Sequence, residues 1–298
     1  MDSKIHGIDY SYFEIKRLIS AIAQKYPFIS VNNIGKTSAG REIPILSLGC
    51  TSDFTLFVTG DDPSFKIGTL ILLQFIAELS QKILAGDEMC GINVRKAMFG
   101  KGIVILPLLN PDGYEIALRG ENGCSDMSHK IARLCGGDFS KWRANLRGVE
   151  ISRNFFTGFE QRRKEESERH ISGPHFAGFS GYRPESEPET VALADFCRRK
   201  NVRQLIALSL GEQTVMYSGT PVTPLKSVRM AEIMAAVTSF SVSPPITNKN
   251  LSFTDWFTYE FHKPAITVKI GGKSAPQCSE LTYWYARLRE LLTLSCLF

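Results

Sequence analysis

The chain has 298 residues, 43% of them hydrophobic, and a formal net charge of +5. This composition is typical of a globular protein, and the small charge excess argues against a nucleic-acid-binding surface, which needs a basic stripe with stacking aromatic residues. No uninterrupted apolar run approaches the roughly 20 residues that span a bilayer, and the amino-terminal segment lacks the apolar stretch of a secretory signal. We therefore expect a cytoplasmic protein with no membrane and no nucleic-acid partner.

The seven cysteines are scattered without paired spacing. In a chain without an export signal, this pattern indicates reduced thiols and no disulfide framework. Cys124 and Cys135 flank a polar loop that contains Asp126 and His129. These residues resemble no standard metal site, so we interpret the cysteines as packing residues. A metal cluster of Cys124, Asp126 and His129 is the alternative.

The amino-terminal part of the chain alternates helix and strand signals. Residues Tyr10 to Lys25 place apolar side chains three or four positions apart, which predicts an amphipathic helix that stops at Pro27. Two short strands separated by a turn-rich segment are predicted next, followed by a third strand and a long apolar helix. These four elements are expected at 29–34, 43–48, 54–59 and 67–84.

The second half of the chain contains buried strands separated by a long irregular region. Residues 102–110 are apolar on both faces, as central strands of covered sheets are. From Pro111 to about Pro184 the chain is rich in Gly, Arg and Ser, and a loop of this length is usually functional, so we expect it to form loops around a cleft. Ser186 and Glu189 have capping-box spacing, which predicts a helix start. Two further buried strands and a closing helix are expected at 202–210, 265–270 and 281–294.

These elements alternate along the whole chain, and no internal repeat or change of composition divides it. Strands that are apolar on both faces need helices on both sides of the sheet. We therefore predict an α/β fold: a single α/β/α domain over residues 1–298 with a central mixed, largely buried sheet.

A tight turn, Gly-Asp-Asp-Pro at 60–63, joins the third strand to the long helix. In α/β proteins, active sites lie at the carboxyl ends of strands, so this junction is a candidate site. The local alternative is that Asp62 caps the following helix, because an Asp side chain accepts hydrogen bonds from the free N–H groups at a helix start.

Two motifs occur in order along the chain: Asn110-Pro111-Asp112-Gly113, and Gly148-Val149 followed by Arg153-Asn154-Phe155. Further segments are "IGKTSAGREIPILSLG" (34–49), "LGEQTVMYSG" (210–219) and "DWFTYEFHKPAITVKIGG" (255–272). Together these segments resemble the zinc carboxypeptidase family of the carboxypeptidase A type. Among its members, they are most similar to bacterial peptidases that cut γ-D-glutamyl-diamino-acid bonds in cell-wall peptides. The resemblance runs from about residue 10 to the end and implies that family's fold.

In that family, a His, a Glu three residues later and a distant His bind zinc, and a separate Glu acts as general base. The resemblance places these four positions at Asp62, Phe65, Leu208 and Lys269. Phe and Leu have no donor atom for zinc, Lys is not a carboxylate base, and none of the five histidines falls at these positions. The resemblance therefore implies a degenerate site with no catalytic residue, no metal ligand set and no cofactor, where the family has zinc.

The resemblance also implies residues that would bind a substrate. Arg143 falls where the family has the arginine that stabilises the oxyanion, and Arg153 falls where it has the arginine that binds the terminal carboxylate. Ser152 replaces the Asn that usually precedes the second arginine. The family's mobile tyrosine corresponds to Asn250 or Thr247, depending on where the gap is placed.

The charged residues of the site allow more than one pairing. We expect the Lys269 ammonium to pair with Asp62, because buried charges are retained mainly when they are paired. The alternative for Lys269 is a nucleophilic lysine with a lowered pKa. The alternative for the two arginines is that they order loops through ion pairs with Glu150 or Glu212.

Three functions are compatible with these residues. The first is a non-catalytic member of the family that binds a peptide or cell-wall peptide through its free carboxylate. The second is an active zinc peptidase with displaced ligands, and the third is a scaffolding protein with a vestigial cleft. We favour the first, because the arginines are present and the zinc ligands are absent. The oligomeric state is not indicated.

Overall fold

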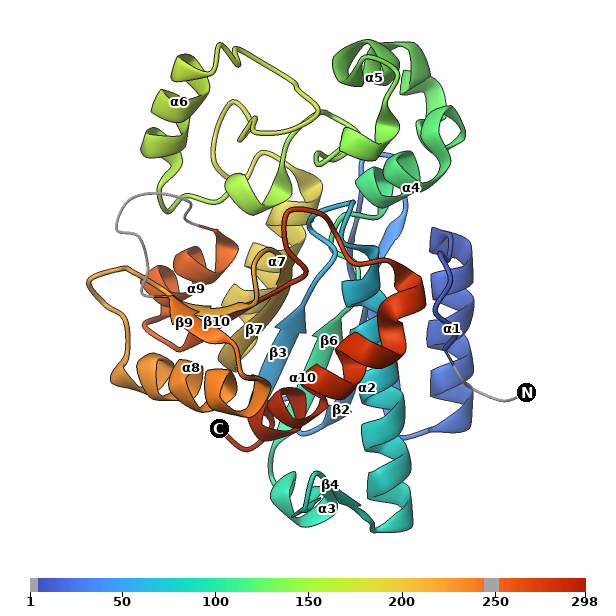
Figure 1. Cartoon of the computed structure of the whole chain (residues 1–298), viewed down its shortest axis with the longest axis vertical. Helices are drawn as coiled ribbons and strands as arrows, with labels where there is room; N and C mark the ends of the chain where they lie inside the picture. Colours follow the sequence, from blue (N-terminus) through green and yellow to red (C-terminus); the bar gives the residue numbers. More distant parts are fainter. Residues whose placement is uncertain (1–4, 244–251) are drawn as a thin grey trace.

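The computed structural model of the chain describes residues 5–243 and 252–298 (Figure 1). Its centre is an eight-stranded sheet with the order β1-β2-β6-β3-β7-β10-β8-β9. The strands of this sheet are β1 (Ile29–Lys36), β2 (Glu42–Gly49), β3 (Phe54–Val58), β6 (Gly102–Leu106), β7 (Val202–Leu210), β8 (Thr214–Tyr217), β9 (Ser241–Ser243) and β10 (Ala265–Ile270). A separate hairpin consists of β4 (Glu88–Met89) and β5 (Ile92–Asn93).

The central sheet is mixed, as the sequence predicts. Strand β3 is parallel to its neighbours β6 and β7, and β10 is parallel to β7. Towards one edge, β2 is antiparallel to both β1 and β6, and on the other side β8 is antiparallel to β10. The parallel strands therefore share one carboxyl-terminal edge.

Helices cover both faces of this sheet (Figure 1). One face packs against α1 (Tyr12–Lys25), α2 (Lys66–Ala85), α8 (Leu225–Thr238) and α10 (Leu281–Ser295), and their buried side chains form the larger hydrophobic cluster. The other face packs against α7 (Pro188–Arg199) and α9 (Phe253–Phe261) in a second cluster. The α/β/α arrangement is confirmed. The extent of the domain, 1–298, stays a prediction.

Local sequence signals set the ends of the first two helices. Helix α1 begins at a capping box, in which the Ser11 side chain accepts from the Glu14 N–H and the Glu14 carboxylate accepts from the Ser11 N–H. Helix α2 ends at Gly86, which has φ +74°. A left-handed residue at this position is the usual helix stop, because glycine has no Cβ to clash with the chain.

The region 111–184, expected to be irregular, contains three helices: α4 (Pro111–Arg119), α5 (Ser128–Cys135) and α6 (Phe159–Glu168). They lie over the carboxyl-terminal edge of the sheet (Figure 1). Helix α6 is almost entirely polar and is held by buried polar contacts. The Arg162 side chain donates to the Phe155 carbonyl (3.0 Å), and the Ser180 N–H donates to Glu166 (2.7 Å). Apolar periodicity could not reveal such a helix.

The predicted capping box at Ser186 and Glu189 is wrong. Helix α7 starts one residue later, with Glu187 as its N-cap and Pro188 in its first turn, and no side chain caps it. The Ser186 hydroxyl donates to the Glu187 carboxylate instead (2.8 Å). Pro188 favours the start of the helix at this point, because its fixed φ suits the first helical position. Elements without a sequence-based prediction are α3 (Val94–Ala97), β4, β5, β8, β9, α8 and α9.

Helix α2 is long and apolar enough to cross a membrane by length and composition, although charged residues interrupt its apolar run. In the fold, 61% of its most apolar window is buried, and it packs on the sheet and on α10. The buried core helix of a globular protein can reach the same length and mean hydropathy. The expectation from the sequence considered only uninterrupted apolar runs, and it therefore understated how apolar this segment is.

Candidate functional site

The candidate site lies where β3, β7 and β10 end, beneath the loops and helices of region 111–184 (Figure 1). After β3 the chain turns sharply at Gly60, which has φ +73°. A Cβ on Gly60 would lie 2.9 Å from the Leu108 Cα atom, so the close approach of the two loops requires glycine. Asn110 stabilises the same turn, because its side-chain amide donates a hydrogen bond to the Asp61 carbonyl (3.2 Å).

Asp62 organises the turn but does not cap α2. Its Oδ1 accepts from both the N–H and the hydroxyl of Ser64, each at 2.8 Å. This is an Asx-type turn, in which the side chain bonds to the backbone two residues later. The N-cap of α2 is Phe65, and no side chain caps the helix. The predicted helix cap at Asp62 is therefore wrong, and the predicted turn is confirmed.

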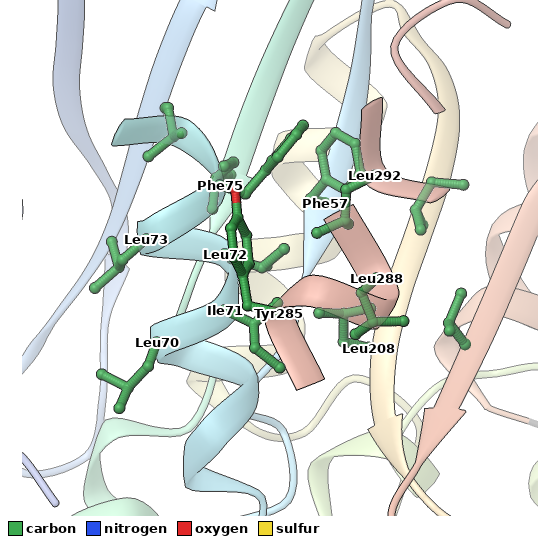
Figure 2. Close-up of a cluster of buried hydrophobic side chains, with 14 of the residues drawn as sticks. Phe57, Leu70, Ile71, Leu72, Leu73, Phe75, Leu208, Tyr285, Leu288 and Leu292 are labelled. Atoms are coloured by element: carbon green, nitrogen blue, oxygen red, sulfur yellow. The ribbon is translucent and has the colours of Figure 1, made fainter. Parts of the chain in front are cut away.

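Phe65 and Leu208 are part of the main hydrophobic core. Each side chain is 1% exposed and belongs to the larger cluster. Figure 2 shows Leu208 among side chains of α2 and α10, beside Leu288. The Phe65 ring lies against Gly68, where an added Cβ would be 2.6 Å from the ring. Both side chains pack against other apolar side chains of this cluster, and neither offers a donor atom to a metal ion.

Lys269 does not form the predicted ion pair with Asp62. Asp62 Oδ1 instead lies 3.5 Å from the Arg143 Nε atom, and no ion pair joins Lys269 to any carboxylate in residues 5–243 and 252–298. The aliphatic part of Lys269 covers Gly211, where a Cβ would be 2.6 Å from its Cδ. Strand β7 separates β3 from β10, which places these two strands about 10 Å apart in the sheet. Arg143 reaches Asp62 from the overlying loop.

Three carboxyl groups crowd this end of the sheet. Burial raises the pKa of Asp61 to about 7, and the nearby Asp62 carboxylate adds to the shift. Burial also raises the pKa of Asp62, against the effect of Arg143, and that of Glu150, against the effect of Arg153. Each charge disfavours ionisation of its neighbours. Sequence reasoning missed Asp61, although its place beside Asp62 at a strand end was a usable signal.

Arg153 pairs with Glu165, not with Glu150 or Glu212. Its Nη2 donates to Glu165 Oε2 at 2.8 Å, and its buried Nε–H has no hydrogen-bond partner among residues 5–243 and 252–298. An unpartnered donor of a guanidinium group is suited to a carboxylate or carbonyl oxygen. Glu165 lies on α6, so an unpredicted helix supplies the partner. The Ser152 hydroxyl lies 3.5 Å from Glu150, at the limit of a hydrogen bond.

Arg143 is more loosely held. Besides the contact with Asp62, its Nη1 donates to the carbonyls of Ser140 (3.0 Å) and Trp142 (3.3 Å). Its side chain is 32% exposed. Asn250 and Thr247, the positions corresponding to the mobile tyrosine, lie outside the described residues.

The donor set at the site does not fit zinc. Of the three positions that the resemblance assigns to ligands, only Asp62 carries a donor atom, and structural zinc sites have four ligands and catalytic sites three. In the described part of the chain, no group of three His, Cys, Asp or Glu side chains is placed to hold a metal ion. The alternative cluster of Cys124, Asp126 and His129 is therefore not assembled. The Cys124 thiol instead donates to the Gly120 carbonyl (3.2 Å).

Comparison with known proteins relates the chain to one family. A family model described as zinc carboxypeptidase matches residues 15–223, which include Asp62, Phe65 and Leu208. The chain is 23% identical over 272 residues to gamma-D-glutamyl-L-diamino acid endopeptidase 1 of Lysinibacillus sphaericus, covering 90% of this chain and 67% of the relative.

Solved structures show the same fold. Bovine thrombin-activatable fibrinolysis inhibitor, solved in complex with tick carboxypeptidase inhibitor, superposes with a TM-score of 0.72 at 17% identity. That match covers 98% of this chain and 96% of the other. The murein-tripeptide amidase MpaA of Escherichia coli O157 has a TM-score of 0.51 at 15% identity, with coverage of 88% and 91%.

Proposed function

The chain belongs to the zinc carboxypeptidase family, and we propose that it is a non-catalytic member that binds a peptide through its free carboxylate. One observation carries the non-catalytic part of this proposal. Phe65 and Leu208, at two of the positions assigned to zinc ligands, are buried in the hydrophobic core and have no metal-binding atom. Displacing them would open the main core of the protein.

The general-base position supports the same conclusion. Metal-assisted hydrolysis needs a metal with an open coordination position and a carboxylate that accepts a proton from the attacking water. Lys269, at the position of the general base, has no carboxylate and does not supply this group. Asp61, Asp62 and Glu150 are carboxyl groups, but in the described part of the chain they do not form a group of ligands placed to hold a metal ion.

The binding part of the proposal rests on the two arginines. Arg153 has a buried Nε–H that no described residue accepts from, and Arg143 is partly exposed and held by a long contact to Asp62. A peptide carboxylate would accept from the Arg153 guanidinium and would compete with Asp62 for Arg143. The relatives that are named for γ-D-glutamyl-diamino acids and for murein tripeptide suggest a cell-wall peptide as the ligand.

A scaffolding role is the second candidate, favoured by a specific observation. Both arginines already have a carboxylate partner within the chain, Asp62 and Glu165. If these internal pairs are stronger than any pair with a ligand, the cleft stays closed to peptides. An active enzyme with displaced ligands finds no support in the described donor set.

Two measurements test the proposal. Zinc content after loading and extensive dialysis, read by elemental mass spectrometry, should be near zero per chain. A retained one-to-one zinc would overturn the non-catalytic assignment, and the same measurement on Asp62→Ala would show whether Asp62 holds it. Calorimetry with a γ-D-glutamyl dipeptide should show saturable binding that its carboxyl-terminal amide lacks. Equal binding of acid and amide, or none, would favour the scaffolding role.

A further inference from the structure

A second concave surface lies at the opposite end of the sheet from Asp62. It is a groove of about 530 Å³ between the strands β1, β2, β6 and β3 and the carboxyl-terminal end of α7. Phe54, the first residue of β3, lines it, whereas the turn that holds Asp62 follows the last residue of the same strand. The groove is thus separate from the candidate site described above.

The groove lies beside the carboxyl-terminal half of α7. Near its start, α7 touches β1 closely: a Cβ on Gly35 would lie 2.7 Å from the Ala192 Cβ. About one turn later the helix carries Phe196, whose ring packs on Phe54 with centroids 6.0 Å apart. Beyond this pair, Arg199 and Lys200 at the end of the helix line the groove together with residues of β1.

The groove is lined by apolar side chains of the sheet and by polar ones, namely Ser30, Asn32, Asn33, Ser47 and Thr51. Ile45, Phe54 and Val104 belong to the second hydrophobic cluster and line the groove from the sheet. Ser47 also lines it, is 8% exposed, and makes no hydrogen bond through its hydroxyl to any described residue. A nearly buried hydroxyl without a partner normally finds one, in water or in a ligand.

The rim of the groove is cationic. Arg199 and Lys200, at the end of α7, line it, and no carboxylate is among its described lining residues. Arg199 is 71% exposed and only loosely paired with Asp195 at 3.6 Å. Lys200 takes part in no ion pair within residues 5–243 and 252–298. Cations at a helix carboxyl terminus also stabilise the helix itself, so the experiment must separate the two roles.

We infer that this groove binds a small amphipathic carboxylic acid, with its apolar body on Ile45, Phe54 and Val104 and its carboxylate at Arg199 and Lys200. The volume is within the range of small-molecule sites, roughly 300–1,000 Å³. The lining combines apolar side chains of the sheet with polar side chains of β1 and the two cations, which suits a molecule with an apolar body and a polar head. The positive rim selects an anion over a neutral or cationic molecule of the same shape. This site is independent of the peptide-carboxylate function proposed above.

The test is a calorimetric titration of the whole chain with sodium octanoate, with 1-octanol and octylammonium as matched probes. Octanoate should bind saturably, octanol at least tenfold more weakly, and octylammonium not at all. The double variant Arg199→Gln/Lys200→Gln should weaken octanoate binding by roughly tenfold or more, the scale of losing charge-assisted contacts. Lys164→Gln/Arg229→Gln, which removes two exposed cations elsewhere, should leave the affinity unchanged.

Two further variants complete the test. Ser47→Phe should fill the groove and abolish octanoate binding, whereas Arg153→Ala should not alter it. Loss of binding in Arg153→Ala would place octanoate in the other site and overturn the inference. Equal binding of octanoate and octanol, or an unchanged affinity in the Arg199/Lys200 variant with an unchanged melting temperature, would also overturn it.

Discussion

The two halves of the candidate site differ in how their side chains are stabilised. Phe65 and Leu208 are apolar and completely packed, so burial itself favours their positions. Arg143 and Arg153 are charged and held by single carboxylates, in surroundings where burial raises the pKa of nearby acids. Burial of the apolar side chains stabilises the fold. Burial of the charged side chains carries a desolvation penalty, which only their pairing with an opposite charge offsets.

The largest effect is expected at the apolar half. Phe65→Ala should lower the free energy of unfolding by roughly 3–5 kcal/mol, because it leaves a cavity in the main core. Urea unfolding followed by circular dichroism measures this. Phe13→Ala is the matched control, since Phe13 is 76% exposed and its loss should change stability by less than about 0.5 kcal/mol. A loss at Phe65 as small as that at Phe13 would mean that Phe65 lines an open cleft.

The next effect is expected in the pH dependence of the free energy of unfolding, to which the buried Asp61 contributes. The pKa of Asp61 is about 7 in the fold against an ordinary value of 3.8. Between these values the folded state binds more protons than the unfolded state, so the contribution of Asp61 makes the protein more stable as the pH falls from about 8 to about 5. Asp61→Asn should flatten this dependence in urea unfolding series. Identical pH profiles for both proteins would show that Asp61 is not buried as described.

Arg153→Ala should weaken binding of the γ-D-glutamyl dipeptide by roughly 1.5–3 kcal/mol, the value of a charge-assisted hydrogen bond. Calorimetry provides the affinity, and Arg229→Ala serves as a control, because Arg229 is exposed. Since the substitution also frees Glu165, the melting temperature must be measured alongside. An unchanged affinity in a folded Arg153→Ala protein would make this arginine a structural residue.

The smallest effect is expected at Asp62. Asp62→Asn removes the carboxylate that competes for Arg143, and it should strengthen dipeptide binding by about 0.2–1 kcal/mol, the range of a partly exposed ion pair. Asn can still accept the hydrogen bonds from Ser64, so the turn is kept. Weaker binding in this variant would indicate that Asp62 contacts the ligand directly.

Much of the fold could be predicted from local pattern. The strands β3, β6, β7 and β10 are apolar on both faces, and α1, α2 and α10 have long apolar stretches, so their positions were predicted to within a few residues, except that the run at 102–110 continues four residues beyond the end of β6. Helix α6 was missed because its stability comes from Arg162 and Glu166, whose partners lie far along the chain. No local window contains that information.

For the site, the sequence by itself determined that the side chains at 65 and 208 offer no donor atom to a metal ion, because Phe and Leu have none in any conformation. Only the tertiary structure decided which charges meet. Lys269 was expected to pair with Asp62, but the order of strands separates them, and the loop over the sheet brings Arg143 to Asp62 while α6 brings Glu165 to Arg153. The physical reason is that donor atoms belong to residue types, whereas an ion pair depends on distances that only the folded chain sets.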